Sequence, residues 1–153
     1  MANVGKTQFL GTKVEVRKKG DTIWDKFVCN SGALNIDFGT YDVSDTAPCL
    51  ETGETEKVFG GLKYEDQTFV YAYTQASTNA GDTTMKNAHA SKGAEEVEFR
   101  LTMNNKTGVE VDGTTYIIPF KVSAYKHLGE SGGIWKTEVS VVQTAIPVET
   151  PAA

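Results

Sequence analysis

Two glutamates are the residues of this sequence best placed to do chemistry. Glu96 and Glu98 lie two positions apart, so on a β-strand their side chains share one face, about 7 Å from each other. Carboxyl pairs roughly 5–9.5 Å apart are the catalytic groups of glycosidases. Such an enzyme also needs an aromatic cleft, for which the sequence offers Tyr71 and Tyr73. A charged strand face in contact with water is far more common than an active site, and we expect the former.

Other catalytic or metal-binding signals are lacking. His89 and His127 have no His, Cys, Asp or Glu at metal-ligand spacing, and no G-x-S-x-G or H-E-x-x-H motif is present. The run GESGG at 129–133 lacks the lysine and the following helix of a phosphate-binding loop. Cys29 and Cys49 fit no metal spacing and are expected to be reduced thiols. The sequence therefore favours a protein that is not an enzyme and that binds no cofactor or metal.

Composition and charge narrow the possible partners. The 153 residues are 39% hydrophobic and 23% charged, which is typical of one soluble domain with its own core. The formal net charge of −5 disfavours tight binding of nucleic acid, because such binding depends on Lys and Arg. It is compatible with nucleic acid that passes without being held. No signal peptide and no apolar run of about 20 residues is found, so we expect no membrane partner.

The glutamate pair belongs to a segment, 94–103, that alternates regularly and predicts a strand with one buried and one polar face. Similar patterns predict further strands, although the pattern at 22–30 is irregular and Pro119 requires an edge or a bulge. The expected buried residues of the central strand are Val97, Phe99, Leu101 and Met103, and the polar ones are Glu96, Glu98, Arg100 and Thr102. The other expected strands are 12–17, 22–30, 31–39, 67–74, 109–114, 116–125 and 135–144.

One helix is predicted, at 79–92. Asp82 or Thr83 can cap its beginning, and Gly93 stands where a C-terminal glycine is typical. Its apolar stripe is short, so we expect it at the edge of the sheet. The sequence thus predicts a mainly β fold, an antiparallel two-sheet β-sandwich or flattened barrel with one flanking α-helix.

Three segments are expected to project from the domain at 12–146. They are an N-terminal arm at 1–11, a long acidic segment at 40–64 and a flexible C-terminal tail at 147–153. The segment 40–64 is interpreted either as a functional loop or as a β-hairpin around 51–53, and both are compatible with a binding role. So many projections on a small domain favour a subunit of a larger assembly.

The order of several motifs resembles a known family. These are GTKVEV at 11–16, a tryptophan at 24, SGALNI at 31–36, QTFVYAY at 67–73, EVEFRL at 96–101 and IPFKVSAY at 118–125. In order and spacing they resemble the major tail tube proteins of long flexible-tailed, lambda-like phages (siphoviruses), over about residues 11–145. The resemblance implies six-subunit rings that stack into a hollow tube and conduct DNA from capsid to host. It implies a virion component assembled in the host cytoplasm, whose partners are further copies, the tape measure protein and the tail tip and terminator proteins.

The resemblance also gives two sets of site residues. A tube lumen is typically acidic, and the lumen candidates by polar face are Glu96, Glu98 and Glu138, unless these acids face outside water. The segment 40–64 is the candidate for contact between rings, mobile in the free subunit and ordered in the tube. Its candidate residues are Asp42, Asp45, Glu51, Glu54, Glu56 and Phe59.

Three alternatives remain open at this stage. One is a related ring protein, such as a secretion-tube protein or a tail terminator, which caps a tube and does not polymerise. Another is a β-sandwich that binds a carbohydrate or a receptor through Tyr64, Tyr71, Tyr73 and Trp135. The third is a hydrolase that uses the glutamate pair.

Overall fold

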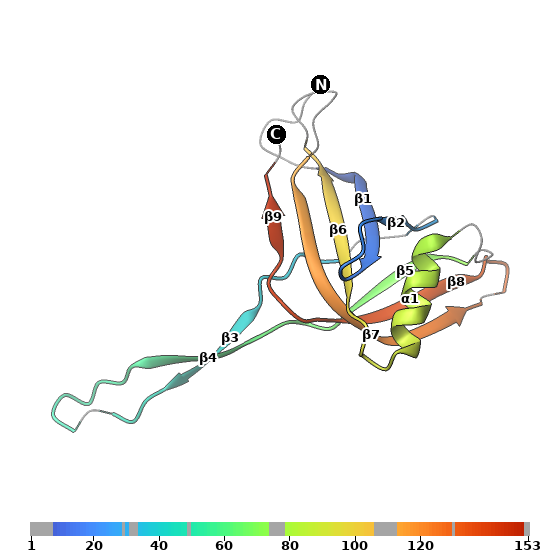
Figure 1. Cartoon of the computed structure of the whole chain (residues 1–153). Coiled ribbons are helices and arrows are strands. Elements are labelled where there is room, and N and C mark those ends of the chain that lie inside the picture. Colours follow the sequence, from blue (N-terminus) through green and yellow to red (C-terminus); the bar gives the residue numbers. More distant parts are fainter. Residues whose placement is uncertain are drawn as a thin grey trace.

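The computed structural model describes residues 8–28, 30, 34–48, 50–73, 79–105, 113–129 and 131–151, and the side chains of all of these except 8–10. The described strands form a seven-stranded antiparallel sheet that curls into a half-barrel and a separate two-stranded hairpin, with one helix against the large sheet (Figure 1). This confirms the expected mainly β fold with a flanking helix. The strands are β1 (Gln8–Lys18), β2 (Asp25–Lys26), β3 (Thr40–Asp45), β4 (Lys57–Lys63), β5 (Gln67–Ala72), β6 (Val97–Asn104), β7 (Thr115–Leu128), β8 (Lys136–Gln143) and β9 (Val148–Thr150), and the helix is α1 (Ala80–Ala90).

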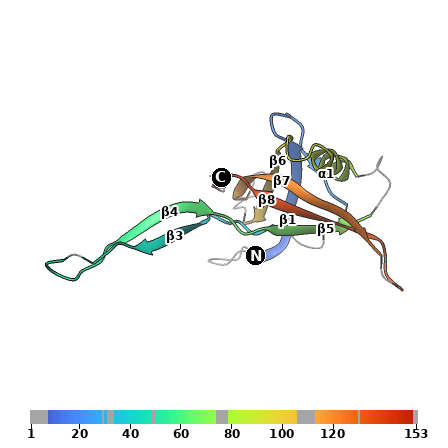
Figure 2. The same cartoon turned by 90° about the horizontal axis from the view of Figure 1, so that it is seen from below.

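The long strand β7 joins the two halves of the large sheet. The strand order is β2-β1-β6-β7-β8-β5, with β9 also paired to β7. The first part of β7 pairs with β6 and β9, and the part from Phe120 onward pairs with β8. A register shift between Val122 and Ala124 marks a bulge, which bends a strand and increases its twist. The sheet is therefore strongly curved, as the view from below shows (Figure 2).

Pro119 occupies a place in β7 where its missing N–H costs no ladder bond. Its carbonyl oxygen accepts a hydrogen bond from the backbone N–H of Thr144 at 3.1 Å. Thr144 lies in the connection between β8, which ends at Gln143, and β9, which begins at Val148. On this side of Pro119 there is therefore no strand that would need an N–H donor from β7. The expectation of an edge or bulge at this proline is consistent with that position.

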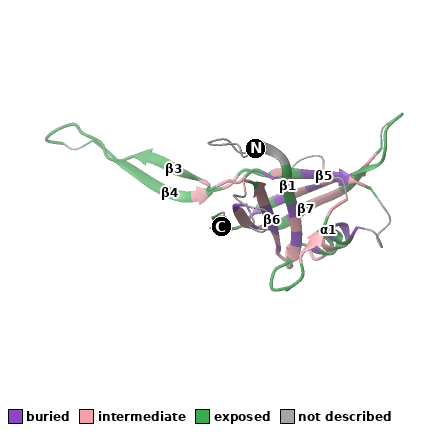
Figure 3. Cartoon of the chain, turned by 90° about the horizontal axis from the view of Figure 1, so that it is seen from above, coloured by how far each residue is buried: buried purple, intermediate pink, exposed green. Residues whose placement is uncertain are grey.

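The core follows the alternation of β6. Val97, Phe99 and Leu101 are buried, whereas Glu98 and Arg100 on the opposite face are partly exposed. Aromatic rings of β5 and β7 surround Phe99, with its centroid 5.6 Å from Phe69 and 5.4 Å from Phe120. Figure 3 shows the buried residues concentrated in the large sheet and the helix, and the hairpin exposed.

The helix closes the core instead of lying at the sheet edge, which corrects our expectation. Met85 and Ala88 are fully buried, because α1 packs across β7 and β1. The helix begins at Asn79, whose side-chain oxygen accepts the backbone N–H of Asp82 at 3.2 Å, so the cap is neither Asp82 nor Thr83. A Cβ atom at Gly81 would lie 2.8 Å from the Phe27 ring, so glycine permits this close approach.

Three other expectations about strands are wrong. The described residues 34–39 form no strand, because side chains take the place of a neighbouring strand as hydrogen-bond partners. The Asp37 carboxylate accepts the backbone N–H groups of Gly39 and Glu65. The strand expected at 22–30 is reduced to the two residues of β2, since Phe27 turns away to pack on the core. The tail at 147–153, expected to be loose, contains β9, which pairs with β7. The strand expected at 109–114 lies mostly outside the described residues.

Candidate assembly surfaces

The segment 40–64 is a β-hairpin that extends away from the body of the protein (Figures 1 and 2). Every described residue from 40 to 61 is exposed. The hairpin interpretation of this segment is therefore confirmed, with its turn beside 51–53. A two-stranded hairpin with no other surface to pack on is marginally stable in water, so a second protein surface would stabilise it.

Apolar side chains line the stem of this hairpin. The rings of Tyr41 and Phe59 stack with centroids 5.6 Å apart, yet 51% and 65% of these side chains remain exposed. Val43 and Val58 beside them are about half exposed, and Leu50 near the turn is fully exposed. Contiguous exposed apolar groups of this kind are typical of surfaces that bind another protein.

The acids of the hairpin fall into two groups. In the stem, Asp42 pairs with Lys63 at 2.8 Å and Asp45 pairs with Lys57 at 2.9 Å. Near the turn, Glu51, Glu54 and Glu56 have no ion pair with any described residue. The six inter-ring candidates, Asp42, Asp45, Glu51, Glu54, Glu56 and Phe59, thus lie on one hairpin, but only its end carries uncompensated negative charge.

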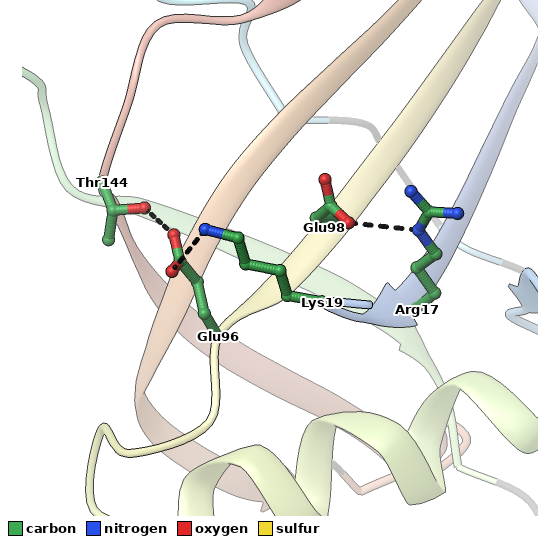
Figure 4. Close-up of polar contacts among 5 residues, drawn as sticks. All are labelled: Arg17, Lys19, Glu96, Glu98 and Thr144. Atoms are coloured by element: carbon green, nitrogen blue, oxygen red, sulfur yellow. Dashed lines mark hydrogen bonds and ion pairs between the residues drawn. The ribbon is translucent and has the colours of Figure 1, made fainter. Parts of the chain in front are cut away.

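The three lumen candidates each lie beside a cation. Glu98 accepts from the guanidinium of Arg17 at 3.1 Å, and Glu96 contacts the ammonium of Lys19 at 3.4 Å and the hydroxyl of Thr144 (Figure 4). Glu138 on β8 pairs with Lys126 of β7 at 3.4 Å. Glu96 and Glu98 are close together, and Glu138 is two strands away. Because each of the three is paired with a cation, the polar face carries ion pairs and is not a purely acidic surface.

A tryptophan covers part of this polar face, which the sequence analysis missed. The guanidinium carbon of Arg17 lies 4.2 Å from the ring centroid of Trp24, and that of Arg100 lies 4.5 Å from it. Arg100 also pairs with Glu15 of β1 at 2.9 Å. Alternating charges at 13–17 and 98–100 were the available signal, but the strand pairing that brings them together is not visible in the sequence.

The geometry gives the glutamate pair little catalytic character. The hydrogen bond from Thr144, followed by the contacts of Lys19, holds the pKa of Glu96 below its ordinary value. The general acid of a glycosidase needs a raised pKa. Tyr71, one of the expected cleft aromatics, is buried and donates its hydroxyl to Asp82 at 2.6 Å. Tyr71 therefore lines no cleft beside the pair, and Glu96 is poorly suited to donate a proton.

The other candidate residues are scattered. Tyr73 and Trp135 are exposed, Tyr64 is half-buried, and with Tyr71 in the core the four aromatics do not form one binding platform. His127 contacts the hydroxyl of Thr137 at 3.0 Å. The described residues contain no group of three or more His, Cys, Asp or Glu able to hold a metal ion. None of the helices in the described part is long and apolar enough to span a membrane.

Comparisons with known proteins identify the fold. No family model and no curated protein sequence matches the chain. Among solved structures, it resembles a chain of the PVC extracellular contractile injection system sheath/tube terminator, with a TM-score of 0.64 and 15% identity over 97% of this chain and 99% of that one. A chain of the anti-feeding prophage tube-terminating cap gives 0.63 and 12% over 99% and 96%. A chain of the PVC sheath–tube complex gives 0.61 and 14% over 91% and 88%. At these identities the likeness establishes a shared fold.

Proposed function

We propose that this chain is a structural subunit of a phage-tail-like tube. The observation that carries the proposal is the near full-length likeness of its fold to chains from tube and tube-terminator structures of contractile injection systems. The hairpin projects from the body of the protein (Figure 1) and exposes apolar side chains along its stem, which supports a role in assembly. A catalytic role has no comparable support.

The finer form of the proposal is a hexameric ring. β2 and β5 end the strand order of the large sheet, and pairing or covering such edges in a closed ring would remove sites of uncontrolled aggregation. Stacked rings would form a hollow tube that conducts DNA from a phage capsid to its host. The hairpin would provide the contact between rings. Partners would then be the tape measure, tail tip and terminator proteins, and the location the virion tail after assembly in the host cytoplasm.

Under this proposal, Glu96, Glu98 and Glu138 face the lumen. Carboxylates repel phosphate groups, and their paired cations would keep the surface from being strongly charged, so that DNA would slide without being trapped.

A tube terminator is the second candidate function. Two of the similar structures are described as a tube-terminating cap and a sheath/tube terminator. A terminator binds the end of a tube and forms a single ring, whereas a tube subunit stacks repeatedly.

Negative-stain electron microscopy of the purified protein, fresh and after concentration, tests both. We expect stacked rings or tubes with a central hole. Single rings that do not stack would favour the terminator. Monomers that fail to polymerise even after a tail-tip extract is added would overturn the tube proposal.

A further inference from the structure

Most cationic side chains of the described chain already have an acidic partner. Arg17, Lys18, Lys19, Lys57, Lys63, Arg100 and Lys126 form ion pairs. The lysines whose ammonium groups form no ion pair with a described residue are Lys13, Lys26, Lys86, Lys92, Lys121 and Lys136. An unpaired charge is an available contact for another molecule, so where these lysines gather is informative.

Two of the unpaired lysines line one hollow on the polar face of β2, β1, β6 and β7. The hollow has a volume of about 250 Å³, below the roughly 300–1,000 Å³ of typical small-molecule pockets. Its size suits one or two inserted side chains. The lining residues are Lys13, Glu15, Lys26, Arg100, Thr102 and Thr115.

The chemistry of this basic hollow favours a carboxylate. Glu15 is engaged by Arg100, which donates to it from Nε at 3.2 Å and from Nη2 at 2.9 Å. The ammonium groups of Lys13 and Lys26 form no ion pair with a described residue. The hydroxyl of Thr102 adds a hydrogen-bonding group beside them, whereas that of Thr115 already donates to the carbonyl oxygen of Gly113 at 3.3 Å. The lining thus holds three cationic side chains and one carboxylate, and that carboxylate is already paired with Arg100.

The end of the hairpin has the complementary chemistry. Residues 46–56 contain three glutamates and no lysine or arginine. The carboxylates of Glu51, Glu54 and Glu56 have no ion pair with a described residue, whereas the stem acids are neutralised by Lys57 and Lys63. The described residues therefore include an acidic tip and a basic hollow whose charges have no ion-pair partner among those residues.

These two surfaces can meet only between molecules. The hairpin points away from the large sheet in both views, and its six-residue strand β3 alone spans about 20 Å, so the tip cannot fold back into its own hollow (Figures 1 and 2).

A second hollow beside the end of α1 also contains two unpaired lysines, Lys92 and Lys121. The negative field of Glu96 already acts on Lys121, and the carbonyl groups at the C-terminal end of a helix disfavour an added anion. The hollow at Lys13 and Lys26 is therefore the better acceptor.

We propose that the acidic hairpin tip of one copy inserts into the basic hollow of a second copy, with Glu51 and Glu54 meeting Lys13 and Lys26. This inference rests on the proposed tube function, since it describes how copies in an assembly recognise each other. The exposed apolar stem adds contact area, and the tip and hollow fix which surface of the next copy is bound.

Charge reversal tests the contact. The double variant Lys13→Glu with Lys26→Glu should raise the protein concentration needed for assembly by about tenfold or more, because like charges then face each other. Glu51→Lys with Glu54→Lys should do the same, and combining all four substitutions should restore assembly. The matched control is Lys86→Glu with Lys136→Glu, which makes the same change of net charge outside the hollow and should assemble normally. Light scattering and electron microscopy measure the outcome.

Zero-length carbodiimide cross-linking of mixed ¹⁴N- and ¹⁵N-labelled protein gives an independent readout on the native chain. We expect mixed-isotope cross-links that join Lys13 or Lys26 to the tip glutamates. Tubes that form without these cross-links, or reversal variants that behave like the control, would overturn the inference and leave the tube function standing. A wild-type protein that neither assembles nor cross-links would overturn both.

Discussion

At the scale of single residues, Asp82 is the group that ties the helix to the sheet. Its Oδ1 accepts hydrogen bonds from the hydroxyls of Tyr71 at 2.6 Å and Tyr125 at 2.7 Å, and the residue is only 8% exposed. Burial, together with these bonds to the carboxylate, raises the pKa of both tyrosines well above the ordinary value. Both hydroxyls therefore remain donors throughout the neutral range. Asp82 acts in packing, although an acid beside two tyrosines could suggest chemistry.

Replacing Asp82 by Asn should lower the free energy of unfolding by about 1–3 kcal/mol, because a neutral amide is a weaker acceptor and brings a buried NH₂ group without a partner. Urea denaturation followed by circular dichroism measures the change. Tyr125→Phe removes only one of the two donors and should cost about 1 kcal/mol. Equal unfolding midpoints for the wild type and Asp82→Asn would contradict the role assigned to this carboxylate.

Glu96 makes the stability depend on pH at the acidic end. Its pKa in the folded protein lies below the ordinary 4.5, because Thr144 and then Lys19 bind the charged form. A lowered folded pKa means that the contribution is complete above about pH 4.5 and is lost as the pH falls through the folded pKa.

We therefore expect Glu96→Gln to be less stable than the wild type at pH 7 and to approach it as the pH falls below 4.5 and through the folded pKa of Glu96. Urea denaturation at a series of pH values measures the difference. Thr144→Val should reproduce part of the effect, and Glu65→Gln, which changes an exposed carboxylate without an ion pair to a described residue, should show none. A difference that persists unchanged at low pH would show that the charge of Glu96 is not the cause.

At the scale of the elements, the hairpin β3–β4 and the strand β6 each contain a phenylalanine, exposed in the hairpin and buried in β6. Phe99 of β6 is fully buried among other aromatic rings, whereas Phe59 of β4 is 65% exposed and stacks on Tyr41 of the same hairpin. One phenylalanine therefore stabilises the fold, and the other is available to a partner.

Phe59→Ala should leave the free energy of unfolding of the unassembled protein within about 0.5 kcal/mol of the wild type and should weaken or abolish assembly. Phe99→Ala is the matched substitution in the core and should cost about 3–5 kcal/mol. Thermal unfolding measured below the concentration of assembly, together with electron microscopy above it, separates the two effects. A Phe59→Ala protein that assembles like the wild type would exclude the stem from the contact.

Elements with regular alternation and a buried face could be predicted from the sequence, and those held by other interactions could not. The faces of β6 and β8 follow from period two, because one side of each strand packs in the core. Leu34, Ile36 and Phe38 show the same period but form no strand, since the side chains of Asp37 and Gln67 take the backbone hydrogen bonds. Local pattern cannot reveal such long-range capping.

The candidate site was predictable only as far as residue type. The acids at 96, 98 and 138 were correctly placed on polar faces, but their pairing with Lys19, Arg17 and Lys126 depends on strand neighbours that the sequence does not specify. The position of Trp24 between two arginines is a further consequence of the same strand pairing. A face interpreted as acidic is for this reason closer to neutral.

At the scale of the whole molecule, this near-neutrality bears on how a tube would conduct DNA. If Glu96, Glu98 and Glu138 face the lumen, their partners Arg17, Lys19 and Lys126 lie there too, and the glutamates prevent these cations from binding phosphate. Replacing all three glutamates by glutamine would leave those cations uncompensated. We expect assembled tubes of this triple variant to retain DNA in a salt-sensitive manner, unlike the wild type.

Co-sedimentation of fluorescent DNA with assembled tubes, at low and at physiological salt, measures this retention. The control is Asp21→Asn with Glu65→Gln and Asp66→Asn, which removes the same number of negative charges from acids without an ion pair to a described residue. If the control retains DNA equally, net charge alone decides the result. If neither variant retains DNA, the three glutamates do not line the path of the DNA, and the opposite face of the subunit must be turned toward the lumen.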